Sequence, residues 1–247
     1  SRYKASFEAA EQRRKDGDNE LNVACRDGIS AALPRLLRGC SAEAAGRALV
    51  IAARYGNRDC VLALLAKAKG IGLKVPAYAS DAVIEVAYGD GQRAPRANYH
   101  SRSDPTLSWF EHEDNERCSI AKVLLSRGAD VEHTDGIVSA LYWACFRGFS
   151  KLVRLLIRSK ADVTVGRTDN GYTPLHTAAD GDIVRLLVQA KADLYKRSIN
   201  NGQSPLDNTA MNGRVDCVQA LLECKADVNQ TRPNGISALY MAAQHGH

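Results

Sequence analysis

The chain has 247 residues, of which 45% are hydrophobic and 25% are charged, and its formal net charge is +5. This is the composition of an ordinary folded protein, and no apolar stretch approaches the roughly 20 residues that a membrane-spanning helix needs. The positive charge is mild and no dense basic run accompanies it, so it fits an acidic partner weakly and gives little indication of nucleic-acid binding.

The first third of the chain predicts a polar helix followed by two pairs of helices. We expect residues 1–20 to form a capping helix, because a helical array needs a polar element over its first apolar face. The segment 21–45 predicts a short, divergent first repeat, in which Pro34 falls early in the second helix. A fuller second repeat, whose second helix contains a Leu-Leu pair, is predicted for 46–80.

A long insertion splits the third repeat, which is predicted to span 81–128. Its first helix is expected at Asp81 to Gly91 and its second at Arg117 to Gly128, with the insertion 92–116 between them. Insertions in repeat proteins map to loops on one face, and long loops of this kind are usually functional or disordered. The insertion ends in an aromatic and acidic run, TLSWFEHEDNE. We expect its charged end to be a solvated loop.

Three more repeats are predicted for 129–161, 162–192 and 193–226, and an incomplete one for 227–247. A short motif recurs in them, reading GIVSAL from Gly136, GYTPLHTAA from Gly171, GQSPL from Gly202 and GISAL from Gly235. These glycines are 35, 31 and 33 residues apart. The final copy has a first helix and no second, so we expect the natural chain to continue. The missing initiator Met likewise predicts that the chain has been processed or cut from a longer one.

Each element of the motif has a physical role in a helical repeat. Gly permits a positive φ in the tight turn, Thr or Ser caps the next helix, and Pro fits its first turn. Self-similarity near 33 residues with the sequence T-P-L-H-x-A is the signature of the ankyrin repeat. The chain therefore resembles ankyrin-repeat proteins over most of its length. The resemblance implies an all-α solenoid of helix–turn–helix repeats, which are joined by β-turn or hairpin tips.

The seven cysteines show neither a C-x-x-C pair nor a His spacing that suits zinc. Cys25 and Cys145 fall where the second Ala of the repeat belongs, and Cys60 and Cys217 share one register. Buried free cysteines behave as small apolar residues, so we interpret these four as packing residues. Free thiols and the absence of a signal peptide predict an intracellular chain, cytoplasmic by default, or in an organelle if a transit peptide has been removed.

No catalytic constellation emerges from the sequence, and we expect no enzymatic activity, cofactor or metal. The resemblance implies that His176 serves structure, through hydrogen bonds within and between the repeat turns. The run HEDNE is not the zinc motif H-E-x-x-H, and no Gly-rich segment is followed by the G-K-[ST] of a phosphate loop.

The plausible site is therefore a surface. In the ankyrin family, ligands bind mostly the turn tips and the exposed ends of the first helices, on the concave side. Carried onto this chain, the tips contribute Asp135, Ile137, Asp169, Asn170, Tyr172, Asn201, Gln203 and Asn234, and the helix ends contribute Arg54, Tyr55, Phe146, Arg147 and Met211. Trp109 and Phe110 in the insertion form a second candidate site: they either fold back onto the repeats or dock into a partner.

These observations favour a non-enzymatic protein–protein interaction module, a scaffold or accessory subunit of a larger assembly. It would bind a protein through the concave face, the tips and the 92–116 insertion. The alternative is a substrate-recruiting or regulatory arm of a longer multidomain enzyme or channel, truncated at the C-terminus. Nucleic-acid binding through Arg93, Arg96 and Arg102 is less favoured, because acidic residues follow them closely.

Overall fold

The computed structural model describes residues 20–89 and 106–247, with the side chains of 106–110 excepted. In these residues all regular structure is helical apart from two isolated antiparallel bridges, Thr134 with Ser139 and Thr231 with Ser237. The predicted all-α repeat architecture is thereby confirmed. The predicted capping helix, except for Glu20, and the three arginines of the insertion lie outside the described residues.

The described residues fall into two compact units. The first contains the residues up to 89 together with 119–130, and the second contains 106–118 together with 131–247. Helix α6 (Thr106–Ser126) contributes its first half to the second unit and its last residues to the first. Each unit is described here on its own.

The first unit is built from short helices around a core of small and branched apolar residues. Residues 20–26 are helical and are followed by η1 (Ser30–Ala32), α2 (Leu33–Leu36), α3 (Ala42–Arg54), α4 (Arg58–Lys67), η2 (Ala68–Ile71) and α5 (Val75–Tyr88). Helix α3 packs against α4 and α5. The approach of α5 is close, because a Cβ atom at Gly46 would lie 2.5 Å from the ring of Tyr78. Only glycine fits this position.

Two helices begin earlier than the sequence predicts. Helix α5 starts at Val75 instead of Asp81, because Pro76 is tolerated in a first helical turn and does not break the apolar run that precedes Asp81. Helix α6 starts at Thr106 instead of Arg117. The run 106–116 contains neither Gly nor Pro, so nothing in it stops a helix that begins after Pro105. The prediction that the charged end of the insertion is a loop is therefore wrong, although residues 111, 112, 115 and 116 are exposed to solvent.

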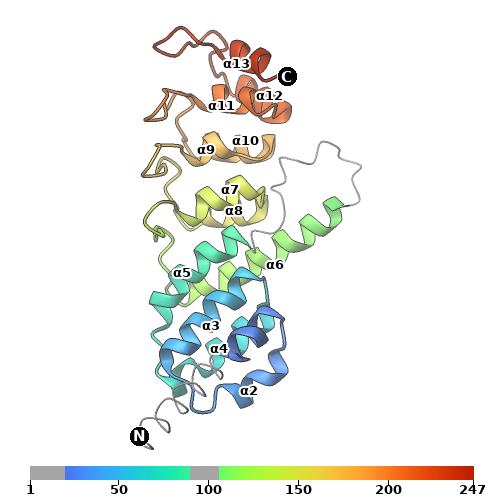
Figure 1. Cartoon of the computed structure of the whole chain (residues 1–247), viewed down its shortest axis with the longest axis vertical. Helices are drawn as coiled ribbons and strands as arrows, with labels where there is room; N and C mark the ends of the chain where they lie inside the picture. Colours follow the sequence, from blue (N-terminus) through green and yellow to red (C-terminus); the bar gives the residue numbers. More distant parts are fainter. Residues whose placement is uncertain (1–19, 90–105) are drawn as a thin grey trace, which may run out of the picture. The chain divides into compact units, whose positions relative to one another are not determined.

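The second unit is a series of stacked helix pairs. Its helices are the first half of α6, then α7 (Ala140–Arg147), α8 (Ser150–Arg158), α9 (Pro174–Thr177), α10 (Gly181–Gln189), α11 (Pro205–Met211), α12 (Val215–Glu223) and α13 (Ala238–Gln244). Figure 1 shows the pairs α7/α8, α9/α10 and α11/α12 one after another, with their connections projecting from one side. The first helices pack on each other, α7 on α9 and α9 on α11, and so do the second helices.

One leucine of the motif shows how a complete pair buries its core. Leu141, Leu175 and Leu206 are at most 4% exposed, whereas the equivalent Leu239 in α13 is 76% exposed. The first three lie in helices that are paired with a second helix, and α13 is followed only by residues 245–247. Leu239 thus lies in a helix that has neither a second helix nor a following repeat beside it in the described residues.

The second helices of this unit end in an uncommon way. Lys160, Lys191 and Lys225 follow α8, α10 and α12 with left-handed φ values of 69°, 72° and 72°. Glycine is the usual residue in this position, and a Cβ atom makes the left-handed conformation cost of order 1–2 kcal/mol. After α6 the equivalent residue is Gly128, with φ of 88°. Three residues of the second unit therefore carry the conformational cost of a left-handed backbone.

Candidate functional site

The four connections that carry the recurring motif form tight turns. In each, the side-chain oxygen of an Asp or Asn accepts a hydrogen bond from the backbone N–H two residues on. The pairs are Asp135 with Ile137 (2.9 Å), Asn170 with Tyr172 (3.0 Å), Asn201 with Gln203 (3.4 Å) and Asn234 with Ile236 (3.3 Å). Such side-chain turns explain the Asp or Asn before each Gly. These four predicted partner contacts therefore shape the tips of the connections.

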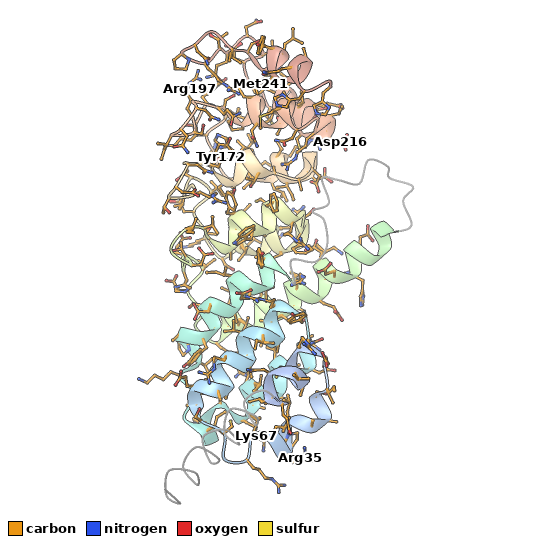
Figure 2. The ribbon with its side chains drawn as sticks, in the orientation of Figure 1. Arg35, Lys67, Tyr172, Arg197, Asp216 and Met241 are labelled. Atoms are coloured by element: carbon orange, nitrogen blue, oxygen red, sulfur yellow. The ribbon has the colours of Figure 1, made fainter. Side chains whose placement is uncertain are left out.

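Adjacent tips in the second unit are joined by hydrogen bonds to main-chain carbonyls. The bonds run from Thr168 N to Ile137 O (3.2 Å), from Ile199 N to Asn170 O (2.8 Å) and from Arg197 Nη2 to Thr231 O (2.7 Å). Figure 2 shows Tyr172 and Arg197 on the side of the connections and Asp216, in the first turn of α12, on the other side. The tips thus form one ordered edge.

His176 is buried at the base of this edge. Its Nδ1 lies 2.9 Å from Thr173 Oγ1 in the same repeat, and its Nε2 lies 3.1 Å from the carbonyl oxygen of Gln203 in the next. The ring of Tyr172 stacks on the imidazole, with the ring centres 5.1 Å apart. Burial lowers the pKa of His176 to about 4, although the Gln203 carbonyl opposes the shift. The prediction that His176 serves structure is confirmed.

Two predicted contact residues are buried, and the expectation that they are exposed is wrong. Gln203 is 2% exposed, since its side chain turns inward and hydrogen-bonds the hydroxyl of Tyr172. Arg147 is 4% exposed. It follows Leu141 and Ala144 at steps of three residues, so it shares their buried face of α7.

The other predicted contacts differ in how far they reach solvent. Exposed side chains are Tyr55 in the first unit and Asp135, Ile137, Asp169, Asn201 and Asn234 in the second; partly exposed ones are Arg54, Phe146, Asn170, Tyr172 and Met211. The guanidinium of Arg54 binds Glu85 through two hydrogen bonds of 2.6 and 2.7 Å, and Asp169 pairs with Arg167. Trp109 and Phe110 lie in α6, but their side chains are outside the described residues.

Sequence reasoning missed the most exposed apolar residue of the tips, Ile199, which is 71% exposed. Ile137, which was predicted, is 46% exposed on the same edge. Their tips are both bonded to the connection between them, through Thr168 and Asn170. We call Ile137, Asp169, Tyr172, Ile199 and Asn201 the tip surface. Ile199 could have been recognised in the sequence as a single apolar residue in an otherwise polar connection.

An aromatic cluster lies on α7. The ring of Trp143 meets those of Tyr142 and Phe146 edge to face, both at 5.8 Å between centres. Arg167 places its guanidinium 5.8 Å from the centre of the Tyr142 ring, and Phe146 remains partly exposed. Edge-to-face packing fixes the orientation of these rings. Phe146 is thereby a pre-oriented apolar contact in the last turn of α7.

The acidic end of the insertion has a structural role that the sequence did not reveal. Asp114 in α6 accepts hydrogen bonds from the backbone N–H groups of Lys151 (2.8 Å) and Leu152 (3.1 Å) at the start of α8. The N-cap residue of α8, Phe149, makes no side-chain cap itself. The guanidinium of the buried Arg117 lies 5.3 Å from the centre of the Phe149 ring. Helix α8 is therefore capped by a carboxylate from another helix.

Nothing in the described parts of the chain forms a metal site. Across residues 20–89 and 106–247, no three His, Cys, Asp or Glu side chains gather in a way that could hold an ion. In those same residues no helix is both long enough and apolar enough to cross a membrane.

The cysteines behave as packing residues. Cys25, Cys60, Cys145 and Cys217 are buried, as predicted, and all seven are free. Burial raises the pKa of Cys217 to about 12, and burial together with the neighbouring Cys60 raises that of Cys25 to about 12. Since the thiolate is the reactive form, these buried thiols are poor nucleophiles at neutral pH.

Two comparisons with known proteins agree with this architecture. The sequence matches the family described as "Ankyrin repeats (3 copies)" over residues 112–198 and 183–247, which together make up more than half of the chain. It is also similar to the Ankyrin repeat and KH domain-containing protein mask-1 of Caenorhabditis elegans, with 27% identity over 179 residues. That alignment covers 68% of this chain and 7% of the relative.

Proposed function

Because the chain belongs to the ankyrin-repeat family, whose repeats generally serve as protein–protein interaction modules, we propose that it binds a protein partner through the tip surface and the partly exposed Phe146. It acts as a scaffold or accessory subunit and has no catalytic activity of its own. The insertion contributes through Trp109 and Phe110. We further propose an intracellular location, which suits seven free thiols.

The observation that carries this proposal is the exposure of Ile199 and Ile137 on an ordered edge. Single exposed apolar residues are common on protein surfaces. These two, however, lie on connections whose backbones are hydrogen-bonded to a shared neighbour. When a partner covers them, this chain therefore loses little conformational entropy. Burying a branched aliphatic side chain contributes about 1.5–3 kcal/mol. The tips therefore offer pre-organised apolar anchors.

A charge placed at both anchors tests the proposal. Ile137→Asp/Ile199→Asp should abolish capture of the partner from an extract, because an aspartate cannot be buried in an apolar contact without a large penalty. The matched control is Val215→Asp. Val215 is 73% exposed and directly precedes Asp216, which lies on the side away from the tips. The proposal fails if every protein captured by the control is also captured by the double variant.

The alternative also has an observation in its favour. The similar protein of Caenorhabditis elegans is far longer than this chain, and its name records a KH domain besides ankyrin repeats. We therefore propose, as a second candidate, that the chain is the substrate-recruiting or regulatory arm of a longer multidomain enzyme or channel. The complete reading frame decides this. A further domain after His247 would support it, and a stop codon shortly after one more helix would exclude it.

A further inference from the structure

We propose that the second unit has another docking surface, at the ends of its second helices, which binds an acidic, extended segment of a partner protein. Lys160, Lys191 and Lys225, here called the lysine row, supply the charge, and the exposed Tyr195 supplies apolar contact. The segment adopts a polyproline II conformation with an acidic residue at every third position. This surface shares no residue with the tip surface.

The first argument is that the backbone does not favour lysine at these positions. All three residues have a left-handed φ, which glycine adopts without penalty. A cation near a helix C-terminus does stabilise the helix dipole. That benefit needs no strained residue, as α6 shows, where Arg127 directly precedes Gly128. A lysine repeated in the strained position of three successive pairs therefore points to a use for its side chain.

The second argument is that the lysine ammonium groups remain available. All three side chains are exposed, and in the part of the chain that the structure describes no ion pair involves them. An aspartate follows each lysine by two residues, yet its carboxylate is directed to the backbone of the next turn. The bonds are from Thr164 N to Asp162 (2.8 Å), from Tyr195 N to Asp193 (2.8 Å) and from Asn229 N to Asp227 (2.9 Å).

The third argument is an ordered aromatic side chain beside Lys225. The hydroxyl of Tyr195 donates a hydrogen bond of 3.1 Å to the carbonyl oxygen of Lys225 in the next repeat. The exposed ring is thereby fixed beside the row. Ordered aromatic rings are the usual docking platform for polyproline II segments, which carry little conformational entropy to lose.

The spacing of the row selects the conformation of the ligand. Packed helices lie about 8–10 Å apart, so lysines at equivalent positions of stacked helices recur at about that interval. A polyproline II helix rises about 3.1 Å per residue with three residues per turn, which places every third side chain on one face about 9 Å apart. In a β-strand, residues three apart point to opposite faces. An acidic polyproline II segment therefore fits the row, and a β-strand does not.

The test uses the full chain and a fluorescein-labelled peptide of five Glu-Leu-Pro repeats. The variant Lys160→Gly/Lys191→Gly/Lys225→Gly should bind the peptide about tenfold more weakly or worse. It should also unfold at a higher denaturant concentration, because glycine relieves the backbone. The matched control is Lys67→Ala/Lys69→Ala/Lys74→Ala, which removes the same charge from exposed positions of the first unit and should bind as the parent does.

Several results would overturn the proposal. They are unchanged binding by the glycine variant, equal weakening in the control, and equal binding of a peptide of Glu-Leu-Pro-Pro repeats, whose acids are four residues apart. Tighter binding of a single-stranded oligonucleotide than of the peptide would assign the row to nucleic acid instead. An Ile137→Ser/Ile199→Ser variant, which removes the apolar anchors without adding negative charge, should keep its affinity for the peptide, so failure of the tip surface and failure of the lysine row are distinguishable.

Discussion

Repeats 162–192 and 193–226 begin with nearly the same motif and continue differently. In the first of them the N-cap of the second helix, Asp180, comes seven residues after Thr173; in the other, Arg214 comes ten residues after Ser204. Helix α9 accordingly has four residues and α11 has seven. The repeat with the best match to the family motif is therefore the one that lacks a helical turn.

The shorter repeat is completed by its neighbours. Arg214, from the following repeat, donates hydrogen bonds to the carbonyl oxygens of Thr177 (2.9 Å) and Ala178 (3.0 Å), where α9 stops. From the preceding repeat, the carbonyl of Cys145 accepts a bond from Ala179 N (3.1 Å). Backbone groups that a longer helix would satisfy internally are thus satisfied from outside. A repeat that matches the family motif well can therefore still depend on its neighbours for its backbone hydrogen bonds.

The two repeats also differ in the fourth residue of the motif. His176 bonds the main-chain carbonyl of the next tip as a neutral group. Asp207 occupies the equivalent position, where it bonds Ser204 N at 2.9 Å and faces the guanidinium of Arg232 at 3.4 Å. Both members of that ion pair are buried. One position thus joins its repeat to the next either through a neutral hydrogen bond or through a buried ion pair.

The largest expected effect comes from breaking the ion pair. Asp207→Ala should lower the free energy of unfolding by about 4 kcal/mol, because it leaves Arg232 buried without its counter-charge and removes the carboxylate that accepts the Ser204 N–H in the capping box of α11. Urea unfolding followed by circular dichroism measures the change. Asp207→Ala/Arg232→Leu should recover part of the loss. If Asp207→Ala lowers the free energy of unfolding by less than about 1 kcal/mol, the buried ion pair does not join its repeat to the next in the way proposed.

The next effect tests the missing turn. Arg214→Ala should lower the free energy of unfolding by about 3 kcal/mol, because two carbonyl oxygens at the end of α9 lose charge-assisted hydrogen bonds in a partly buried site. Arg214→Lys should restore about half, since an ammonium group can reach fewer acceptors in a fixed geometry. If Arg214→Ala unfolds at the same urea concentration as the parent, the short repeat does not depend on its neighbour.

Features that recur in every repeat could be predicted from the sequence, and contacts that occur in only one repeat could not. The motif spacing revealed the helix pairs and the role of His176, because these depend on residue types at fixed intervals. It could not reveal that Asp114 caps α8, since that bond joins residues 37 apart through an insertion that no other repeat contains. The burial of Arg147 follows a pattern that the sequence does contain, since Arg147 lies at three-residue steps from Leu141 and Ala144 on one face of the helix. The side-chain direction of Gln203 was not readable, because it depends on Tyr172 in the preceding tip.

A third prediction concerns pH. The folded pKa of His176 is about 4, against about 6.5 in the unfolded chain, so the unfolded state binds more protons between these values. The stabilisation from neutral His176 is therefore fully present above about pH 6.5 and is lost as the pH falls towards 4. Between pH 7 and pH 5 the loss should be about 2 kcal/mol. His176→Gln should lack this component of the pH dependence when both proteins are unfolded in urea at the two pH values. Equal slopes would refute the assignment.

The smallest expected effect concerns the N-terminal caps of the second helices α10 and α12, which differ. The side chain of Asp180 accepts a hydrogen bond from Ile183 N (2.9 Å) at the start of α10, whereas the N-cap of α12, Arg214, makes no side-chain cap. Asp180→Ala should therefore lower the free energy of unfolding by about 1 kcal/mol.

Asp216→Ala is the control for this change, since Asp216 is an exposed acid in the first turn of α12. It should cost no more than about 0.3–0.5 kcal/mol, and that cost should vanish at high salt. The loss from Asp180→Ala should persist at high salt, because a hydrogen bond to a backbone N–H at 2.9 Å is not screened as a distant charge is. If both losses vanish together at high salt, Asp180 acts through its charge and not through this hydrogen bond. The shorter repeat then needs no cap of its own, because its neighbours already hold its second helix in place.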